Sequence, residues 1–355
     1  TSTSPSMPRS ASRRSTRHTK SCRTRKSGRG TIASALLDAT LFYEILLGEI
    51  VTREGDPGTG YALVLEAARR SNDERLFQRA TDIALQARAG DQALAAAQAW
   101  KQATPQSTDA NRYVLQILIA LNRIDDIPTP LREMLDQTPD AEKPGMLLAL
   151  PQLLRRAPDK AQAARMLEKA LNTELRAEGA AAAAAWTAIG RMRLQAQDAT
   201  GALDAARRGQ ASQAQADGPA VLALELMENG TADAEPLLTA YLQQRPSPEV
   251  RMAYARLLLE QQRYPEARSQ LKAVTTEKPD LPQAWLAQAA LQVQDQQYEA
   301  AEASLGELLR LAKSSPDNET LRASLTQAYL LHAQIAEKRG DYAAAEQWLQ
   351  RIEDG

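Results

Sequence analysis

The sequence has few of the residues on which catalytic and metal sites depend. It contains one cysteine, Cys22, and two histidines, His18 and His332, among 355 residues. A single thiol cannot form an intramolecular disulfide, and no second cysteine lies near it to build a zinc site. The motifs of serine hydrolases, phosphate-binding loops, zinc proteases and redox dithiols are missing as well. We therefore expect no catalytic residues, no metal site and no cofactor, and we do not expect an enzyme.

Aromatic residues and long apolar runs are also scarce. Aromatics make up 4% of the chain, and only two are phenylalanine. No run of 18 apolar residues exists, so no membrane-spanning helix is predicted. The apolar stretch 113–121, "YVLQILIAL", is too short to span a membrane and predicts a buried helix. Alanine, leucine, glutamine, arginine and glutamate dominate, and they are strong helix formers, so the composition predicts an all-α fold.

The positive charge is concentrated at the N-terminus. Residues 1–30 hold nine of the 43 Lys and Arg residues and none of the 44 Asp and Glu residues. The remainder therefore has 34 basic and 44 acidic residues, a net charge near −10, which argues against nucleic-acid binding by the folded part. We expect 1–30 to be a disordered basic tail. Three origins stay open: an artefact of a shifted reading frame or wrong start, a linker, or an arm for nucleic acid or anionic membrane.

A short pattern recurs along the chain. It occurs as "QQRYPEA" (261–267), "DQQYEAA" (295–301) and "KRGDYAAA" (338–345), each with a tyrosine three residues before an alanine. The alanine marks a small residue that opens the second helix of a predicted hairpin, and we call it the anchor residue. The anchors are Gly60, Ala93, Ile127, Ala163, Ala202, Ala234, Ala267, Ala301 and Ala345. Most of their spacings lie close to 34 residues.

Other residues keep fixed offsets from the anchors. Trp186 and Trp285 each precede an anchor by the same 16 residues, and the four tryptophans are interpreted as core residues. Prolines follow several anchors by 12 residues, where a helix should end: Pro105, Pro139, Pro246 and Pro279. With its 34-residue period, the chain resembles the tetratricopeptide repeat family. The resemblance is strong at 183–216, 248–281 and 326–353, and weaker at Ile127 and Ala163.

This resemblance implies a right-handed α-solenoid of about nine stacked antiparallel helix pairs over residues 31–355. The stretch 311–320 lengthens the last interval, so we expect a long loop or a lengthened helix there. No polar capping helix follows the last pair, although solenoids usually need one. We therefore expect the natural array to continue beyond residue 355, with this chain truncated at its C-terminus.

The predicted function is protein binding by a scaffold or adaptor. By register, the inner face of the first helices presents two arginines among apolar side chains, a surface that suits an extended or helical protein segment. The candidate partner-binding residues are Arg191, Met252, Arg256, Leu259, Leu286 and Val293, and the same face includes Thr187, Leu194, Ala290, Leu330 and Gln334. The alternative is that they pack against neighbouring helices. The lysines and asparagines by which chaperone-docking members hold a terminal carboxylate are missing here.

A finer resemblance concerns residues 41–85. This stretch is similar to the start of bacterial tetratricopeptide lipoproteins that act as adaptors of a carboxyl-terminal processing protease. The resemblance implies an alternative function as the regulatory adaptor of a periplasmic protease or a cell-envelope assembly complex. Its partners would be the protease and its substrates, and its location the periplasmic side of the outer membrane; otherwise we expect a cytoplasmic protein.

Overall fold

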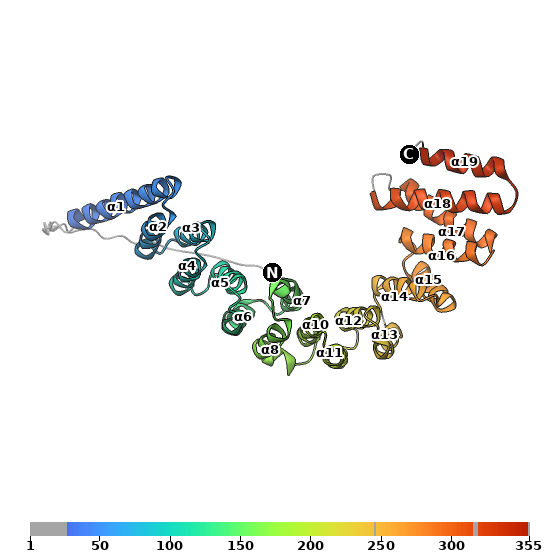
Figure 1. Ribbon diagram of the computed structural model, residues 1–355, viewed down its shortest axis with the longest axis horizontal. Coiled ribbons are helices and arrows are strands. Elements are labelled where there is room, and N and C mark those ends of the chain that lie inside the picture. The colour runs from blue at the N-terminus through green and yellow to red at the C-terminus, as the bar shows by residue number, and fades with distance from the viewer. Residues whose placement is uncertain (1–26, 245, 315–318, 354–355) are drawn as a thin grey trace, which may run out of the picture. The chain divides into compact units, whose positions relative to one another are not determined.

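The computed structural model describes residues 27–244, 246–314 and 319–353, and within these ranges every regular element is helical (Figure 1). The all-α solenoid class is therefore confirmed. No helix of the described ranges is long and apolar enough to cross a membrane. The basic tail predicted for 1–30 falls mostly outside the described residues, and the first helix begins at Ser27.

The chain divides into two compact units, residues 1–96 and 97–355, which are described separately. The first unit contains α1 (Ser27–Arg53), α2 (Pro57–Ser71), α3 (Glu74–Gln86) and the beginning of α4 (Gly90–Ala103). The second unit contains the rest of α4 and α5 (Thr108–Ala120), η1 (Ile124–Asp126), α6 (Pro128–Gln137), α7 (Lys143–Leu153), η2 (Leu154–Arg156), α8 (Lys160–Ala170), α9 (Asn172–Leu175), α10 (Ala180–Gln195), α11 (Ala199–Ser212), α12 (Asp217–Glu228), η3 (Ala232–Ala234), α13 (Glu235–Leu242), α14 (Pro248–Glu260), α15 (Tyr264–Glu277), α16 (Pro282–Gln294), α17 (Tyr298–Ser314), α18 (Glu319–Lys338) and α19 (Tyr342–Glu353).

In the first unit, α1 and α2 approach closely at two glycines. The Gly60 Cα on α2 faces the turn of α1 that contains Gly48 and Thr52. A Cβ at residue 60 would lie 2.7 Å from the Gly48 carbonyl oxygen and would collide with the Thr52 hydroxyl. That hydroxyl already donates to the Gly48 oxygen at 2.7 Å. The anchor assigned to Gly60 is therefore a point where the two helix backbones meet.

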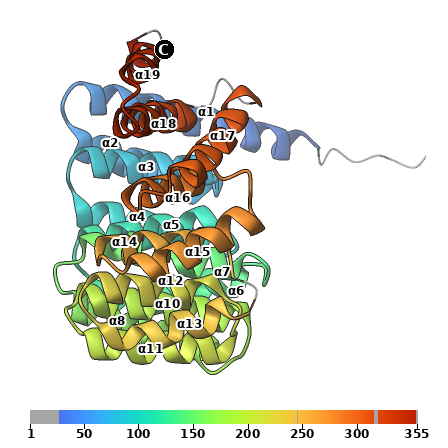
Figure 2. The same ribbon diagram turned by 90° about the vertical axis from the view of Figure 1, so that its right-hand side faces the viewer.

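The predicted helix pairs follow one another along the chain. Each anchor residue lies in or at the start of the second helix of its pair, and the anchors from Gly60 to Ala301 are all buried. In the second unit the first helices also pack on one another, α7 on α10, α10 on α12, and α12 on α14 (Figure 2). Ile127 and Ala234 depart from the pattern because each caps the second helix next to a 3-10 turn, η1 or η3, rather than lying inside the helix. The four offset prolines all follow the ends of second helices, as predicted.

The recurring pattern marks the turn between the two helices of a pair. Gln262 and Gln296 take the left-handed conformation, with φ of 61° and 62°, and Gly340 does so with φ of 79°. The Arg263 amide donates to the Leu258 oxygen at 2.8 Å, which closes the turn in the manner of a Schellman motif. Each turn therefore ends the first helix and starts the second within a few residues.

The tyrosine of the pattern does not have the same environment in each pair. Tyr264 and Tyr298 are half-buried and pack against core clusters. Tyr342 is 72% exposed and does not pack in this way. Of the tryptophans, Trp100 is buried, whereas Trp186, Trp285 and Trp348 are half-buried.

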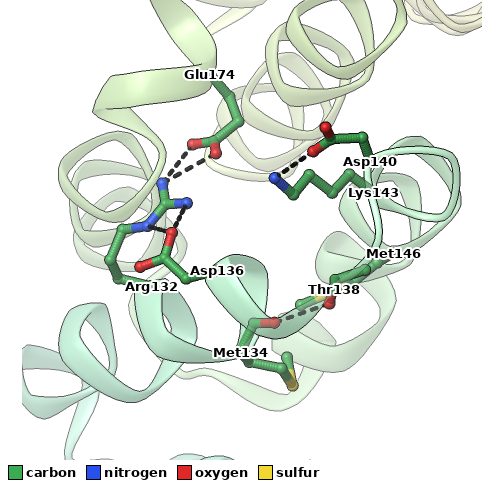
Figure 3. Close-up of polar contacts among 8 residues, drawn as sticks. All are labelled: Arg132, Met134, Asp136, Thr138, Asp140, Lys143, Met146 and Glu174. Atoms are coloured by element: carbon green, nitrogen blue, oxygen red, sulfur yellow. Dashed lines mark hydrogen bonds and ion pairs between the residues drawn. The ribbon is translucent and has the colours of Figure 1, made fainter.

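The two long anchor intervals have separate structural causes. Between Ala163 and Ala202 the short helix α9 is inserted, and it carries the buried Glu174. Arg132 of α6 donates to both carboxylate oxygens of Glu174, at 2.9 and 2.8 Å, and also to Asp136 (Figure 3). The last interval is long because α17 and α18 have 17 and 20 residues, whereas α14 has 13. A long loop or a lengthened helix was expected at 311–320; the helices on both sides are long, and residues 315–318 lie outside the described residues.

We expect Ala267→Leu to destabilise the protein by about 2 kcal/mol, because the larger side chain overpacks the core. Ala267 is fully buried in the cluster that contains Leu258 and Leu271. A urea titration followed by circular dichroism measures the change. Ala290→Leu, at an exposed position, is the control and should change the free energy of unfolding by about 0.5 kcal/mol or less. Equal stability of Ala267→Leu and the parent would contradict the packing of α14 on α15.

Candidate partner-binding surface

The predicted binding residues lie on three first helices, α10, α14 and α16, and α12 lies between α10 and α14 (Figure 1). Equivalent positions lie at the same offset from the anchors, as for Arg191 and Arg256, which each precede their anchor by 11 residues. We define the first-helix face as the residues of these four helices that stay exposed or half-exposed on that side: Arg191, Leu194, Glu225, Arg256, Leu259, Leu286 and Ala290. The face mixes charged groups with apolar side chains.

Two of the predicted residues are not available on this face. Met252 is 4% exposed and Val293 is 6% exposed, and both pack in the core. Thr187 is fully buried, and its hydroxyl donates to the Ala183 oxygen at 2.8 Å. A partner could reach Met252 or Val293 only after the helices separate. These two residues therefore pack against neighbouring helices, which was the alternative to partner binding.

The remaining predicted residues keep part of their surface. Leu259 and Leu286 are half-buried, each packed against a core cluster with one side toward solvent. Arg256 is exposed, and its guanidinium reaches the Gln283 side-chain oxygen at 3.4 Å, at the long end of hydrogen bonding. The Arg256 guanidinium is therefore free to reorient toward a partner.

Arg191 has a carboxylate partner that the sequence analysis did not identify. Its guanidinium donates to both Glu225 oxygens, with distances of 2.8 to 3.1 Å, and both side chains are about one-third exposed or less. The pair joins α10 to α12. The 34-residue spacing of opposite charges was the signal that could have revealed it.

Buried tyrosines hold the helices behind this face. The Tyr241 hydroxyl donates to Asp217 at 2.6 Å and accepts from the Ser247 amide at 2.8 Å. Burial, followed by the hydrogen bond to Asp217, raises the pKa of Tyr241 to about 12. Tyr241 thus stays a neutral donor and ties α13 to the starts of α12 and α14.

A second tyrosine makes a similar link one helix later. The Tyr254 hydroxyl donates to Glu235 at 2.6 Å, and burial raises the pKa of Tyr254 well above its usual range. Arg263 lies 2.7 Å from the same carboxylate, and its hydrogen bond holds the pKa of Glu235 below the usual value. This network fixes α13 against α14 and the turn before α15.

His332 has a packing role at the end of the second unit. It is 8% exposed, and its ring stacks on Trp348 with centroids 4.1 Å apart and an angle of 8°. Arg351 lies over the same tryptophan ring at 4.1 Å. The buried Nε2 has no hydrogen-bond partner among the described residues. No group of three or more potential metal ligands occurs within the described ranges.

We expect acidification from about pH 7.5 to about pH 5.5 to loosen α19 from α18. Burial lowers the pKa of His332. The negative charge of Glu302 on α17 raises this pKa, and the positive charge of Arg351 on α19 lowers it further. The folded state disfavours the protonated ring of His332. The contribution of the neutral ring to stability is therefore fully present above the pKa of His332 in the unfolded chain, and it is lost as the pH falls from that value through the lower pKa of the folded state. Hydrogen exchange of the α19 amides measures this, after correction for intrinsic rates. His332→Phe keeps an aromatic ring there and should remove the pH effect; the same loosening in this variant would contradict the assignment.

Comparison with known proteins supports a repeat architecture. Residues 225–291, which run from α12 to α16, match the tetratricopeptide repeat family. No curated protein matches the sequence.

Three solved structures are similar to the chain at low identity. PilF from Pseudomonas aeruginosa is 17% identical; the match covers 61% of this chain and 94% of that one, with a TM-score of 0.40. The C-terminal part of a repeat-containing protein from Cytophaga hutchinsonii is 16% identical, with coverages of 68% and 93% and a TM-score of 0.45. Yeast Tom70 is 12% identical, with coverages of 89% and 76% and a TM-score of 0.38.

Proposed function

We propose that this chain, which carries tetratricopeptide repeats at residues 225–291, is a non-catalytic scaffold that binds protein partners through the first-helix face. Proteins built from this repeat generally serve in protein interaction. One observation carries the proposal: α14 has the exposed Arg256 and the half-exposed Leu259, and α16, which Arg256 reaches through Gln283, has the half-exposed Leu286. Such a face offers apolar contact area and a guanidinium for a carboxylate or carbonyl group of the bound segment.

The Arg191–Glu225 pair has a defined place in this proposal. A partner carboxylate that binds Arg191 would displace Glu225 and leave it without a cation. The partner must therefore offer Arg191 hydrogen bonds as good as those of Glu225. Arg256 carries no such cost, since among the described residues its side chain makes only the long hydrogen bond to Gln283 and no ion pair. Arg256 is therefore the stronger candidate for contact with a partner, and Arg191 for keeping α10 and α12 in register.

A finer form of the proposal is an adaptor of a periplasmic protease or of a cell-envelope assembly complex. It is supported only by the likeness of residues 41–85 to the start of the adaptor lipoproteins. Under this form the bound proteins would be a processing protease and its substrates, such as cell-wall hydrolases. Identification of such a protein among specifically retained partners would favour it.

Affinity capture with the full chain as bait tests the scaffold function. We expect specific proteins to be retained from a bacterial envelope extract and to be lost with Arg256→Glu/Leu286→Ser. Both positions have exposed surface, so the fold should survive. Arg191 is tested in a separate variant, Arg191→Gln. A glutamate at residue 191 would lie beside Glu225 and add a repulsion between two carboxylates.

The control variant changes the opposite side of the solenoid. Arg207 and Lys272 are exposed on the second helices α11 and α15, and Arg207→Glu/Lys272→Glu should retain every partner. Circular dichroism melts of all variants establish that each is folded. If the first-helix variant retains the same partners as the parent, the first-helix face is not the binding surface.

A further inference from the structure

A hollow lies between two other first helices, α5 and α7, at the end of α7. Its volume is about 770 Å³, and it is lined by Gln116, Ile119, Ala120, Gln152, Leu153, Arg155 and Arg156. Sites that enclose a ligand or an anchoring side chain range over about 300–1,000 Å³. The apolar part comes from Ile119, Ala120 and Leu153, and the polar part from two glutamines and two arginines. The hollow therefore combines an apolar floor with hydrogen-bonding and cationic groups.

The hollow lies where α7 ends. Pro151 lies inside α7, where it cannot donate a backbone hydrogen bond, and the α-helix stops at Leu153. The 3-10 turn η2 follows and carries both arginines. The Lys160 ammonium donates to the backbone oxygens of Leu154 and Arg155, which holds this turn in place. The arginines are thus presented by a fixed turn beside the apolar floor.

The charge at the hollow is unbalanced. Arg155 and Arg156 are exposed, and no carboxylate among the described residues forms an ion pair with either. Arg132 and Arg193, in neighbouring helices, instead pair with Glu174 and Glu168. Two adjacent unpaired guanidiniums stand out in a chain whose residues after 30 have a net charge near −10. This concentration of positive charge attracts an anion and repels a basic segment.

We propose that this hollow binds an acidic peptide segment, with an apolar side chain seated on Ile119 and Leu153 and carboxylates held by Arg155 and Arg156. The exposed amides of Gln116 and Gln152 are placed to bond the backbone of the segment. The inference rests on the proposed scaffold function and specifies the chemistry of one partner. It adds a docking position on α5 and α7, separate from the first-helix face of α10 to α16.

Fluorescence anisotropy with the full chain tests the inference. The probe is a short fluorescein-labelled peptide in which pairs of glutamates alternate with leucines. We expect saturable binding that weakens about tenfold or more in Arg155→Glu/Arg156→Glu. Ala120→Trp fills the hollow from an exposed position and should weaken binding to a similar extent without changing the charge. Higher salt should weaken binding by the parent, because the contacts are at an exposed rim.

Matched controls separate this site from other sources of binding. Arg207→Glu/Lys272→Glu makes the same change in charge elsewhere and should bind the probe like the parent. Probes with glutamine in place of glutamate, or serine in place of leucine, should bind about tenfold more weakly. Absence of probe binding, or unchanged binding in both hollow variants, would overturn the inference. The inference would also be overturned if laurate or a thymidine oligonucleotide bound more tightly than the peptide and displaced it. The hollow would then be a site for a lipid or for a nucleic acid.

Failure here and failure of the scaffold function give different results. If Arg256→Glu/Leu286→Ser loses the peptide while the hollow variants keep it, the acidic segment binds the first-helix face and only the hollow is rejected. If envelope proteins are captured by the parent but the probe does not bind, the scaffold proposal stands without this docking position.

Discussion

Gly60→Ala is expected to lower the free energy of unfolding of the first unit by about 3 kcal/mol, at the upper end of overpacking effects. The new Cβ would lie 2.7 Å from the Gly48 carbonyl oxygen, closer than atoms of this kind approach one another. It would also collide with the Thr52 hydroxyl, which is held by its bond to the Gly48 oxygen. The Gly48 oxygen belongs to the backbone and cannot rotate away as a side chain could. The clash can therefore be removed only if α1 and α2 move apart.

Hydrogen exchange of the α1 and α2 amides in the full chain measures this effect region by region. Gly58→Ala is the matched control, because Gly58 lies one half-turn earlier in α2 and is exposed. Its Cβ would meet only an Asp56 side-chain oxygen at 3.6 Å, an ordinary contact. Alanine is the better helix former, so this control should stabilise α2 by about 0.5–1 kcal/mol. Equal protection in both variants would contradict the close approach of α1 and α2.

Arg132→Met is expected to lower the free energy of unfolding of the second unit by about 3 kcal/mol, as for the loss of one partner from a buried ion pair. The Glu174 side chain is 6% exposed and receives two hydrogen bonds from Arg132 (Figure 3). Without the guanidinium, the Glu174 carboxylate would be buried beside a thioether. We expect α9 to lose its contact with α6, since this pair ties the inserted helix to the stack.

Two further variants isolate the ion pair in urea titrations. Asp136 is 62% exposed and also binds Arg132, so Asp136→Asn should cost about 0.5 kcal/mol. The double variant Arg132→Met/Glu174→Leu replaces the pair by apolar side chains and should recover most of the loss. If the double variant is as unstable as Arg132→Met alone, an unpaired Glu174 is not the cause.

Much of the fold could be predicted because the repeat acts through local chemistry. Ala202, Ala234, Ala267 and Ala301 are buried anchors of second helices, in the predicted register. A small residue at such a contact is required wherever two helices approach closely, and that requirement is visible in one sequence. The left-handed turns at Gln262 and Gln296 were not predicted, because glutamine carries no signal of positive φ. The Arg132–Glu174 pair was not predicted either, because its residues come from different hairpins.

The candidate site was harder to predict than the fold. The sequence indicates which helices present a face, but Met252 and Leu286 show that it does not indicate exposure. They occupy equivalent positions of consecutive repeats and are both apolar, yet Met252 is buried and Leu286 is half-exposed. The Arg191–Glu225 pair is a similar case, because a charge at a given register can serve a neighbouring helix or a partner.

By itself, the sequence determined the helical class, the period and the pairing of the helices. These follow from helix propensity, from small residues at helix contacts and from prolines at helix ends, all of which act over a few residues. Only the tertiary structure decided which side chains of the first helices stay available and where the stack is imperfect. The hollow beside Arg155 and Arg156 depends on how the end of α7 and the turn η2 lie against α5. Burial and unfilled space are set by the neighbouring helix, and its position depends on contacts between residues distant in sequence.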